Sequence, residues 1–200
     1  MYDKKFEQLP ERNVSLWWTW LQSYKYFQQV EDQLRIDLTF NRSVLDKARR
    51  WLSKQTPENW RYVEFVRVLI HVRRQDYDNP ILERRGWTKP TMDYFQRSMS
   101  YFTDCLKRVQ FVVLSDDPAW CRRHLRAKNI IYPRKHSPII DLAIASLCDH
   151  AIITIGSYGW WAAWFANGIT ITQKNMPRNG SIISEKIHRH DYYKSEWIGL

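Results

Sequence analysis

Several features that identify a protein class directly are missing from this 200-residue sequence. It has no apolar run of about 18 residues, so no transmembrane helix is expected. Its first ten residues are polar and charged, so no signal peptide is expected there. The three cysteines, Cys105, Cys121 and Cys148, fit neither a zinc-ligand spacing nor a CxxC redox motif. The GxGxxG dinucleotide fingerprint, the P-loop and the HExxH motif are absent as well.

Charge and aromatic residues are what the sequence has in excess. Lysine and arginine number 31 against 21 acidic residues, giving a net charge of +10, and 15% of the residues are aromatic. Such a chain attracts nucleic acid, membrane phosphates or a phosphate-bearing small molecule. The aromatic residues stand mostly at core spacing, so no nucleic-acid partner is expected. The length suits one domain or slightly more.

The chain after residue 62 alternates β-branched apolar runs with amphipathic segments. The runs that predict strands are 65–72, 109–114, 129–132, 151–155 and 169–172. The segments that predict helices are 90–107, 117–125, 138–148 and 159–166. This alternation indicates an α/β fold, with a parallel sheet covered by helices on both faces.

The first sixty residues instead show helical spacing. One expected helix, over residues 16–30, carries an apolar stripe of Trp17, Trp20, Leu21, Tyr24 and Phe27. A second is expected to begin after Asn41 and to end at the Thr56-Pro57 pair. We therefore expect two parts, a helical segment over residues 1–62 and an α/β domain over residues 63–200.

Ligands of parallel sheets bind at the carboxyl ends of the strands, so the residues that follow the strands are candidates for a site. The first strand runs out into His71-Val72-Arg73-Arg74-Gln75-Asp76, where His71 and Arg73 share one side and Arg74 turns the other way. Two guanidiniums suit a diphosphate, since each binds phosphate oxygens in bidentate fashion. The alternative is a surface arginine pair bridged to Asp76.

Two further strand ends carry candidate residues. Asp117, after the second strand, suits the N-cap of the next helix. The turn Gly156-Ser157-Tyr158-Gly159, after the fourth strand, opens a helix and presents backbone N–H groups to a phosphate. The alternative is structural, because tight strand-to-helix turns need glycine in any case.

Five ordered stretches give the sequence a specific resemblance. HVRRQDY after a strand resembles the HxRRxD motif of fucosyltransferases that use GDP-fucose, and the wider match resembles the α-1,2-fucosyltransferase family (glycosyltransferase family 11). The stretches are LQSYKYF (21–27), IHVRRQDY (70–77), FVVLSDDPAWC (111–121), DLAIASLCDH (141–150) and IITIGSYGWWAA (152–163).

The resemblance implies a GT-B type enzyme with two Rossmann-like halves. Residues 63–200 are then the GDP-fucose-binding half, and residues 1–62 a helical remnant of the acceptor-side half. The implied reaction is inverting, metal-independent transfer of L-fucose from GDP-fucose to the 2-hydroxyl of a terminal galactose on a glycan.

By the same resemblance, Arg73 and Arg74 hold the diphosphate, while Gly156 and Ser157 reach the β-phosphate. This assignment is chemically coherent, because negative charge builds on GDP as the fucose–phosphate bond breaks. Arginine cations and helix N–H groups placed there stabilise the transition state without a metal.

The remaining implied residues surround the nucleoside and the acceptor. His71 and Asp141 lie near the nucleoside, with Asp141 facing the guanine. Inversion needs a base for the acceptor hydroxyl, and Asp76 is either that base or a residue that positions an arginine. Asp76-Tyr77-Asp78 also matches DxD, a metal-binding motif of a different glycosyltransferase fold. Because HVRR precedes it, we interpret this match as a coincidence.

The sequence departs from the family at several points. Gln75 stands where glycine is usual, and Ser157-Tyr158 stands where Thr-Phe is usual. About 65 residues precede the HVRR strand, which is too few for a first Rossmann-like half, so the chain is expected to be N-terminally truncated. The alternative function is therefore a catalytically inactive relative that binds a nucleotide sugar or a protein.

The expected compartment is the lumen of the Golgi, with membrane attachment only through an anchor that these residues lack. This expectation follows from the resemblance and from three glycosylation sequons, at Asn13, Asn41 and Asn179. Sequons that never meet the glycosylation machinery are the alternative.

Overall fold

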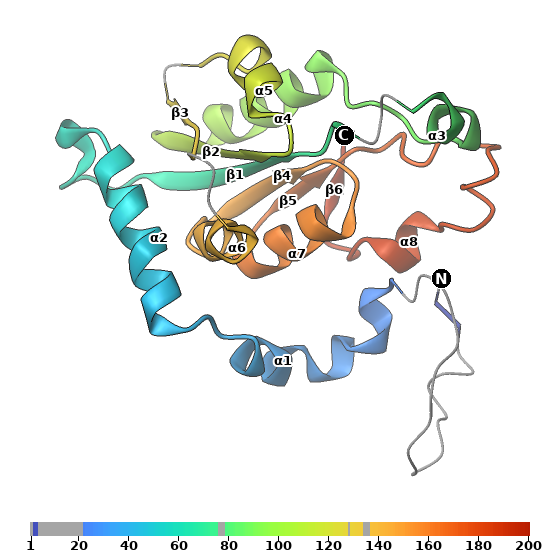
Figure 1. Ribbon diagram of the computed structural model, residues 1–200, viewed down its shortest axis with the longest axis horizontal. Helices are drawn as coiled ribbons and strands as arrows, with labels where there is room; N and C mark the ends of the chain where they lie inside the picture. The colour runs from blue at the N-terminus through green and yellow to red at the C-terminus, as the bar shows by residue number, and fades with distance from the viewer. Residues whose placement is uncertain (1, 4–21, 76–78, 128, 134–136) are drawn as a thin grey trace.

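The computed structural model describes residues 2–3, 22–75, 79–127, 129–133 and 137–200. Its centre is a six-stranded sheet in the order β3-β2-β1-β4-β5-β6 (Figure 1), in which every neighbouring pair is parallel. The strands are β1 (Val66–Val72), β2 (Val109–Ser115), β3 (Ile130–Ile131), β4 (His150–Ile153), β5 (Thr170–Thr172) and β6 (Ile198–Gly199). The predicted parallel α/β fold is confirmed. The two-residue β6 is too short for a periodic pattern to indicate.

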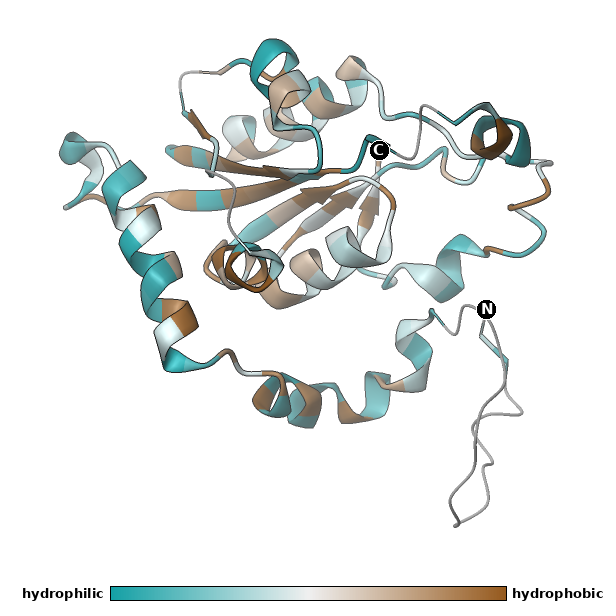
Figure 2. Ribbon diagram, in the orientation of Figure 1, coloured by the Kyte–Doolittle hydropathy of each residue, from teal (hydrophilic) through white to brown (hydrophobic). Residues whose placement is uncertain are grey.

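The strands are apolar because both faces of the sheet are covered. Successive side chains of a strand point to opposite faces, and the two faces belong to different apolar clusters. Leu69 and Ile153 are fully buried in one cluster, while Val68 and Ile70 are fully buried in the other. Strands buried on both faces need nearly continuous apolar runs. Figure 2 shows the longer strands coloured mainly as hydrophobic.

Helices supply the two covers (Figure 1). α4 (Met92–Cys105) and α5 (Pro118–His124) lie on one face, and α6 (Pro138–Ala145) and α7 (Ser157–Ala166) lie on the other. α2 (Arg42–Gln55) packs against α6. The remaining α-helices in the described ranges are α1 (Glu31–Asp37), α3 (Pro80–Arg85) and α8 (Arg189–Tyr192). None of the helices in these ranges combines the length and the apolar character that crossing a membrane requires.

Side-chain caps explain where two of these helices begin. The Asn41 side chain accepts a hydrogen bond from the Ser43 N–H at the start of α2. The Asp117 carboxylate accepts one from the Trp120 N–H at the start of α5. Both caps satisfy an N–H group that lacks a partner within its helix, and both were predicted from the sequence.

The continuous helix predicted over residues 16–30 is wrong where the structure describes it. Tyr24–Tyr26 and Gln28–Val30 form two separate 3₁₀ turns, and α1 begins only at Glu31. The predicted stripe residues Trp17, Trp20 and Leu21 lie outside the described residues.

Contacts to distant elements explain the break. The Phe27 ring stacks on Trp161 at 5.7 Å and meets Trp160 edge-on at 5.9 Å. The Lys25 ammonium donates a hydrogen bond to Asp191 Oδ1 at 2.6 Å. These contacts hold the segment against α7 and α8, and tertiary contacts of this kind override helix propensity.

The segment before β1 contributes to the same core as the sheet. Ala48 and Leu52 of α2 are buried in the cluster that contains α6 and α7, and Phe40 and Trp51 pack against it. Figure 1 shows this segment running beside that face of the sheet. The division into residues 1–62 and 63–200 stays a prediction.

Candidate functional site

The ends of β1 and β4 bring Arg73 next to the glycine turn. The two strands are neighbours in the sheet, and the Arg73 N–H donates a hydrogen bond to the Thr154 hydroxyl at 2.8 Å. A Cβ atom built on Gly156 lies 3.7 Å from Cδ of Arg73. The Arg73 side chain therefore lies alongside Gly156, at the carboxyl edge of the sheet where ligands of such folds bind.

Gly156 makes the turn that begins α7. Its φ of 122° and ψ of 145° lie in a region that side-chain-bearing residues rarely adopt. It occupies the N-cap position, where it has no side chain to bond the first N–H groups of α7. Ser157, the first residue of the helix, is exposed. The first turn thus presents N–H groups and the positive end of the helix dipole beside Arg73.

Arg74 turns the other way, as predicted from strand geometry. Its guanidinium carbon lies 4.0 Å from the centre of the Trp120 ring, and its Nε is 3.5 Å from Asp117 Oδ2. The side chain is 19% exposed, against 40% for Arg73. Stacking on an aromatic face and pairing with a carboxylate fix the guanidinium in place. Arg74 therefore lies on the α5 side of the β1 loop.

Asp116 organises the loop that carries both arginines, and the sequence analysis missed it. Its carboxylate accepts hydrogen bonds from the N–H groups of Arg74 (2.8 Å) and Gln75 (3.2 Å), and it lies 3.9 Å from Nε of Arg73. The Gln75 side-chain amide donates to the Asp116 carbonyl oxygen at 2.9 Å. Gln75 is thus anchored to the end of β2. The signal for this role was the position of Asp116 directly after β2, the neighbour of β1.

Replacing Asp116 with asparagine should destabilise this loop. Asparagine keeps one acceptor oxygen, but it loses the charge and the second acceptor. We expect the free energy of unfolding to fall by about 1–3 kcal/mol in chemical denaturation, the usual cost of leaving a hydrogen-bonding group without its partner. Asp46→Asn is the matched control, because the contacts of Asp46 within the described residues are exposed ion pairs on α2. Equal losses in the two variants would contradict this role.

His71 is buried beneath the first turn of α7. Its ring centre lies 5.4 Å from that of Tyr158, and a Cβ atom built on Gly159 would lie 2.5 Å from its Nδ1. Burial, assisted by the nearby Arg73 charge, lowers the pKa of His71 to about 4. The imidazole is therefore neutral near pH 7. Gly159 is required here because any side chain would collide with the ring.

Tyr158 connects His71 to Asp141. The Tyr158 hydroxyl donates a hydrogen bond to the Pro138 carbonyl oxygen at 2.8 Å, which joins the starts of α7 and α6. Burial and, secondarily, the Asp141 charge raise the pKa of Tyr158. Asp141 sits in the first turn of α6, and its Oδ1 atom is buried. The structure thus brings His71 and Asp141 to the same region, around Tyr158.

Asp76 and Asp78 lie outside the described residues, so their predicted roles stay predictions. Within the ranges that the structure describes, no group of three or more histidine, cysteine, aspartate or glutamate side chains is placed to hold a metal ion.

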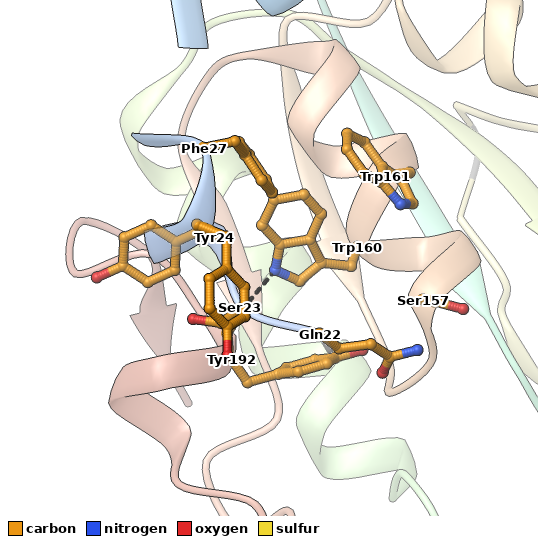
Figure 3. A pocket seen from close by; sticks show the side chains of 9 residues that line it. Gln22, Ser23, Tyr24, Phe27, Ser157, Trp160, Trp161 and Tyr192 are labelled. Carbon is orange, nitrogen blue, oxygen red and sulfur yellow. Dashed lines mark hydrogen bonds between the residues drawn. The ribbon is translucent and has the colours of Figure 1, made fainter. Parts of the chain in front are cut away.

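A pocket of about 270 Å³ opens beside the first turns of α7 (Figure 3). Three separate parts of the chain line it, and most of the lining side chains are aromatic. The lining residues are Gln22, Ser23, Tyr24, Tyr26 and Phe27 from the N-terminal segment, Ser157, Trp160 and Trp161 from α7, and Tyr192 from α8. Sequence reasoning missed this pocket, although two of its three parts belong to the stretches LQSYKYF and IITIGSYGWWAA.

Known proteins resemble this chain along most of its length. The galactoside alpha-(1,2)-fucosyltransferases 1 of Bos taurus and Sus scrofa are 30% identical over 185 and 183 residues, and galactoside 2-alpha-L-fucosyltransferase SEC1 of Bos taurus is 27% identical over 183 residues. These matches cover 89% of this chain and 51%, 50% and 49% of the respective relatives. The chain therefore spans about half the length of the curated relatives it matches.

A solved structure also aligns with part of the chain. The beta Kdo 2,7 transferase KpsC of Thermosulfurimonas dismutans aligns with a TM-score of 0.38 and 13% identity, over 72% of this chain and 46% of that chain.

The family itself is defined by a sequence profile. The profile described as glycosyl transferase family 11 matches residues 2–200. Because this match covers nearly the whole sequence, the chain belongs to glycosyl transferase family 11.

Proposed function

We propose that this chain is the GDP-fucose-binding half of an α-1,2-fucosyltransferase with a GT-B architecture. The complete reaction is the inverting transfer of L-fucose from GDP-fucose to the 2-hydroxyl of a terminal galactose on a glycan. The observation that carries the proposal is the position of Arg73 beside the Gly156 turn at the start of α7. Family membership and the names of the relatives support the choice of substrates.

The diphosphate is assigned to the space between Arg73 and the first turn of α7. The Arg73 guanidinium supplies a positive charge and up to two parallel hydrogen bonds to phosphate oxygens. The N–H groups after Gly156, together with the Ser157 hydroxyl, supply further donors. As the fucose–phosphate bond breaks, negative charge accumulates on the β-phosphate. Donors that are already in place stabilise that charge without reorganisation.

The environment of Arg74 differs from that of Arg73. Arg74 remains a predicted diphosphate ligand, but Trp120 and Asp117 fix its guanidinium on the α5 side. Its backbone N–H is bound to Asp116, so this residue also holds the loop that presents Arg73.

The nucleoside is assigned to the region around Tyr158. Asp141 is proposed to accept hydrogen bonds from the guanine, because a carboxylate pairs with two N–H donors. His71 is neutral near pH 7, so it contributes a donor and an acceptor rather than a charge.

The acceptor hydroxyl must lose a proton as it attacks. Asp76 is proposed either as the base or as a residue that positions an arginine. No metal is part of this proposal. The proposed compartment is the Golgi lumen.

A turnover assay tests the proposal against its alternative. The purified chain is incubated with GDP-fucose and lactose, and released GDP is measured. We expect the chain to bind GDP-fucose. GDP release that depends on lactose would exclude the alternative, a catalytically inactive relative, and the absence of both binding and release would contradict the donor site.

Gly156→Ala should weaken GDP binding about tenfold, or about 1.4 kcal/mol. A Cβ atom has room there, since its nearest described neighbour is Cδ of Arg73 at 3.7 Å. Alanine rarely adopts a φ of 122°, so the turn must rearrange, and this rearrangement moves the N–H groups of α7.

Gly180→Ala is the matched control, because Gly180 also has a positive φ, of 70°, and nothing lies within 4 Å of its built Cβ. Calorimetry with GDP should show a change for the first variant only. Unchanged affinity in Gly156→Ala would contradict the role of the turn.

A further inference from the structure

We propose that the aromatic pocket beside α7 is a subsite for a single pyranose ring. This inference rests on the proposed function, because the ring is either the fucose of the donor or the terminal galactose of the acceptor. Both sugars present the same chemistry, namely an apolar C–H face and a rim of hydroxyl groups. Figure 3 shows the side chains that surround this space.

The size of the pocket fits one sugar ring. Its volume of about 270 Å³ is slightly below the range of about 300–1,000 Å³ that is usual for small-molecule pockets. A whole nucleotide sugar would need the larger end of that range. The pocket therefore suits one part of a larger substrate.

The walls are aromatic and held in place. The Trp160 indole N–H donates a hydrogen bond to the Tyr192 carbonyl oxygen at 2.7 Å, which fixes the ring between α7 and α8. Phe27 meets Trp160 edge-on and stacks on Trp161. Aromatic rings offer flat apolar surfaces with few rotatable bonds. Such surfaces can cover the C–H face of a pyranose at little cost in conformational entropy.

Polar groups accompany these walls. Within the described residues, the Gln22 amide and the Ser157 hydroxyl make no hydrogen bond to the protein, and both residues line the pocket. Together they offer donors and acceptors to sugar hydroxyls. Small-molecule sites typically combine mainly apolar walls with a few polar groups that fix orientation.

The position of the pocket links it to the proposed diphosphate site. Ser157 lines the pocket and directly follows Gly156, whose built Cβ lies next to Arg73. Trp160 and Trp161 come three and four residues after Ser157, so all three share one side of α7. A sugar in this pocket would therefore lie next to the β-phosphate, where the bond to fucose breaks.

The test measures sugar binding directly. Saturation-transfer NMR titrations use methyl β-D-galactoside and, separately, L-fucose, each in the presence of GDP. The variants are Trp161→Ala, which removes one wall, Trp161→Phe, which keeps an aromatic ring, and Gln22→Ala, which leaves the aromatic packing intact. Tyr62→Ala is the control. Tyr62 is 95% exposed and precedes β1, so it lies near the amino ends of the strands, whereas the pocket lies beside the start of α7.

We expect the wild-type chain to bind at least one of the two sugars. Trp161→Ala should weaken that binding about tenfold, because it removes apolar surface from the site. Gln22→Ala should weaken it severalfold, whereas Trp161→Phe and Tyr62→Ala should bind nearly as the wild type does. Binding of L-fucose identifies a donor subsite, and binding of the galactoside identifies an acceptor subsite.

Two outcomes would overturn the inference: no binding of either sugar to the wild-type chain, or binding that is unchanged in both Gln22→Ala and Trp161→Ala. Should Trp161→Ala fail to fold, Gln22→Ala decides alone, and unchanged sugar binding in that variant overturns the inference. Calorimetry with GDP on the same samples separates the two failures. If the wild-type chain binds GDP but neither sugar, only the inference about the pocket is overturned. If the wild-type chain does not bind GDP, the proposed function itself is contradicted.

Discussion

Arg73→Ala should weaken the binding of GDP about 10- to 100-fold. Hydrogen bonds to charged groups contribute about 1.5–3 kcal/mol each, and every 1.4 kcal/mol is about tenfold in affinity. Arg73 is the arginine whose side chain lies alongside Gly156, so its loss removes one wall of the proposed diphosphate site. Isothermal titration calorimetry with GDP measures the effect.

Two variants sharpen this prediction. Arg50→Ala removes the same charge from an exposed position on α2 and should leave the affinity unchanged. Arg73→Lys keeps the charge but loses the planar fork, so it should fall between the wild type and Arg73→Ala. An Arg73→Ala affinity equal to that of Arg50→Ala would contradict a specific role of Arg73 in GDP binding.

Acid should destabilise the folded chain through His71. Burial lowers its pKa to about 4 in the folded state, against an ordinary value of 6.5. Between these values the unfolded chain binds more protons at this residue than the folded chain does, so stability falls as the pH falls. The contribution is fully present above about pH 6.5 and is lost as the pH falls toward 4. Across this window it amounts to about 3 kcal/mol, at 1.36 kcal/mol per pKa unit.

The measurement compares chemical denaturation at about pH 7.5 and at about pH 5. Over that interval the wild type should lose about 2 kcal/mol from this residue. Burial also lowers the pKa of His150, so this residue adds a loss of stability of the same sign. The His71→Asn variant loses the contribution of His71 and keeps that of His150, so the stability of this variant should depend less on pH than that of the wild type. Parallel pH profiles for the wild type and His71→Asn would contradict the burial of a neutral imidazole.

Local sequence patterns predicted most of the fold. The strands were found because a sheet covered on both faces requires long β-branched runs, as in residues 65–72, and the caps at Asn41 and Asp117 carry their own local signal. The helix expected over residues 16–30 was wrong because Phe27 and Lys25 are placed by α7 and α8, more than a hundred residues away. Periodicity alone contains no information about such partners.

The candidate site shows the same limit. Arg73, Arg74 and the Gly156 turn were predicted to share one site because they follow strands of one parallel sheet. The structure places Arg73 beside Gly156 but holds the Arg74 guanidinium against Trp120 and Asp117. Asp116 was missed because its role depends on β2 lying next to β1, which the sequence does not state. The pocket was missed for a similar reason, since Gln22 and Trp161 approach only when the first segment folds back over α7.

A crystal structure of the chain with GDP tests the central claim most directly. The account predicts that oxygens of the β-phosphate accept hydrogen bonds from the Arg73 guanidinium and from the Ser157 backbone N–H. A diphosphate bound away from both groups would contradict it.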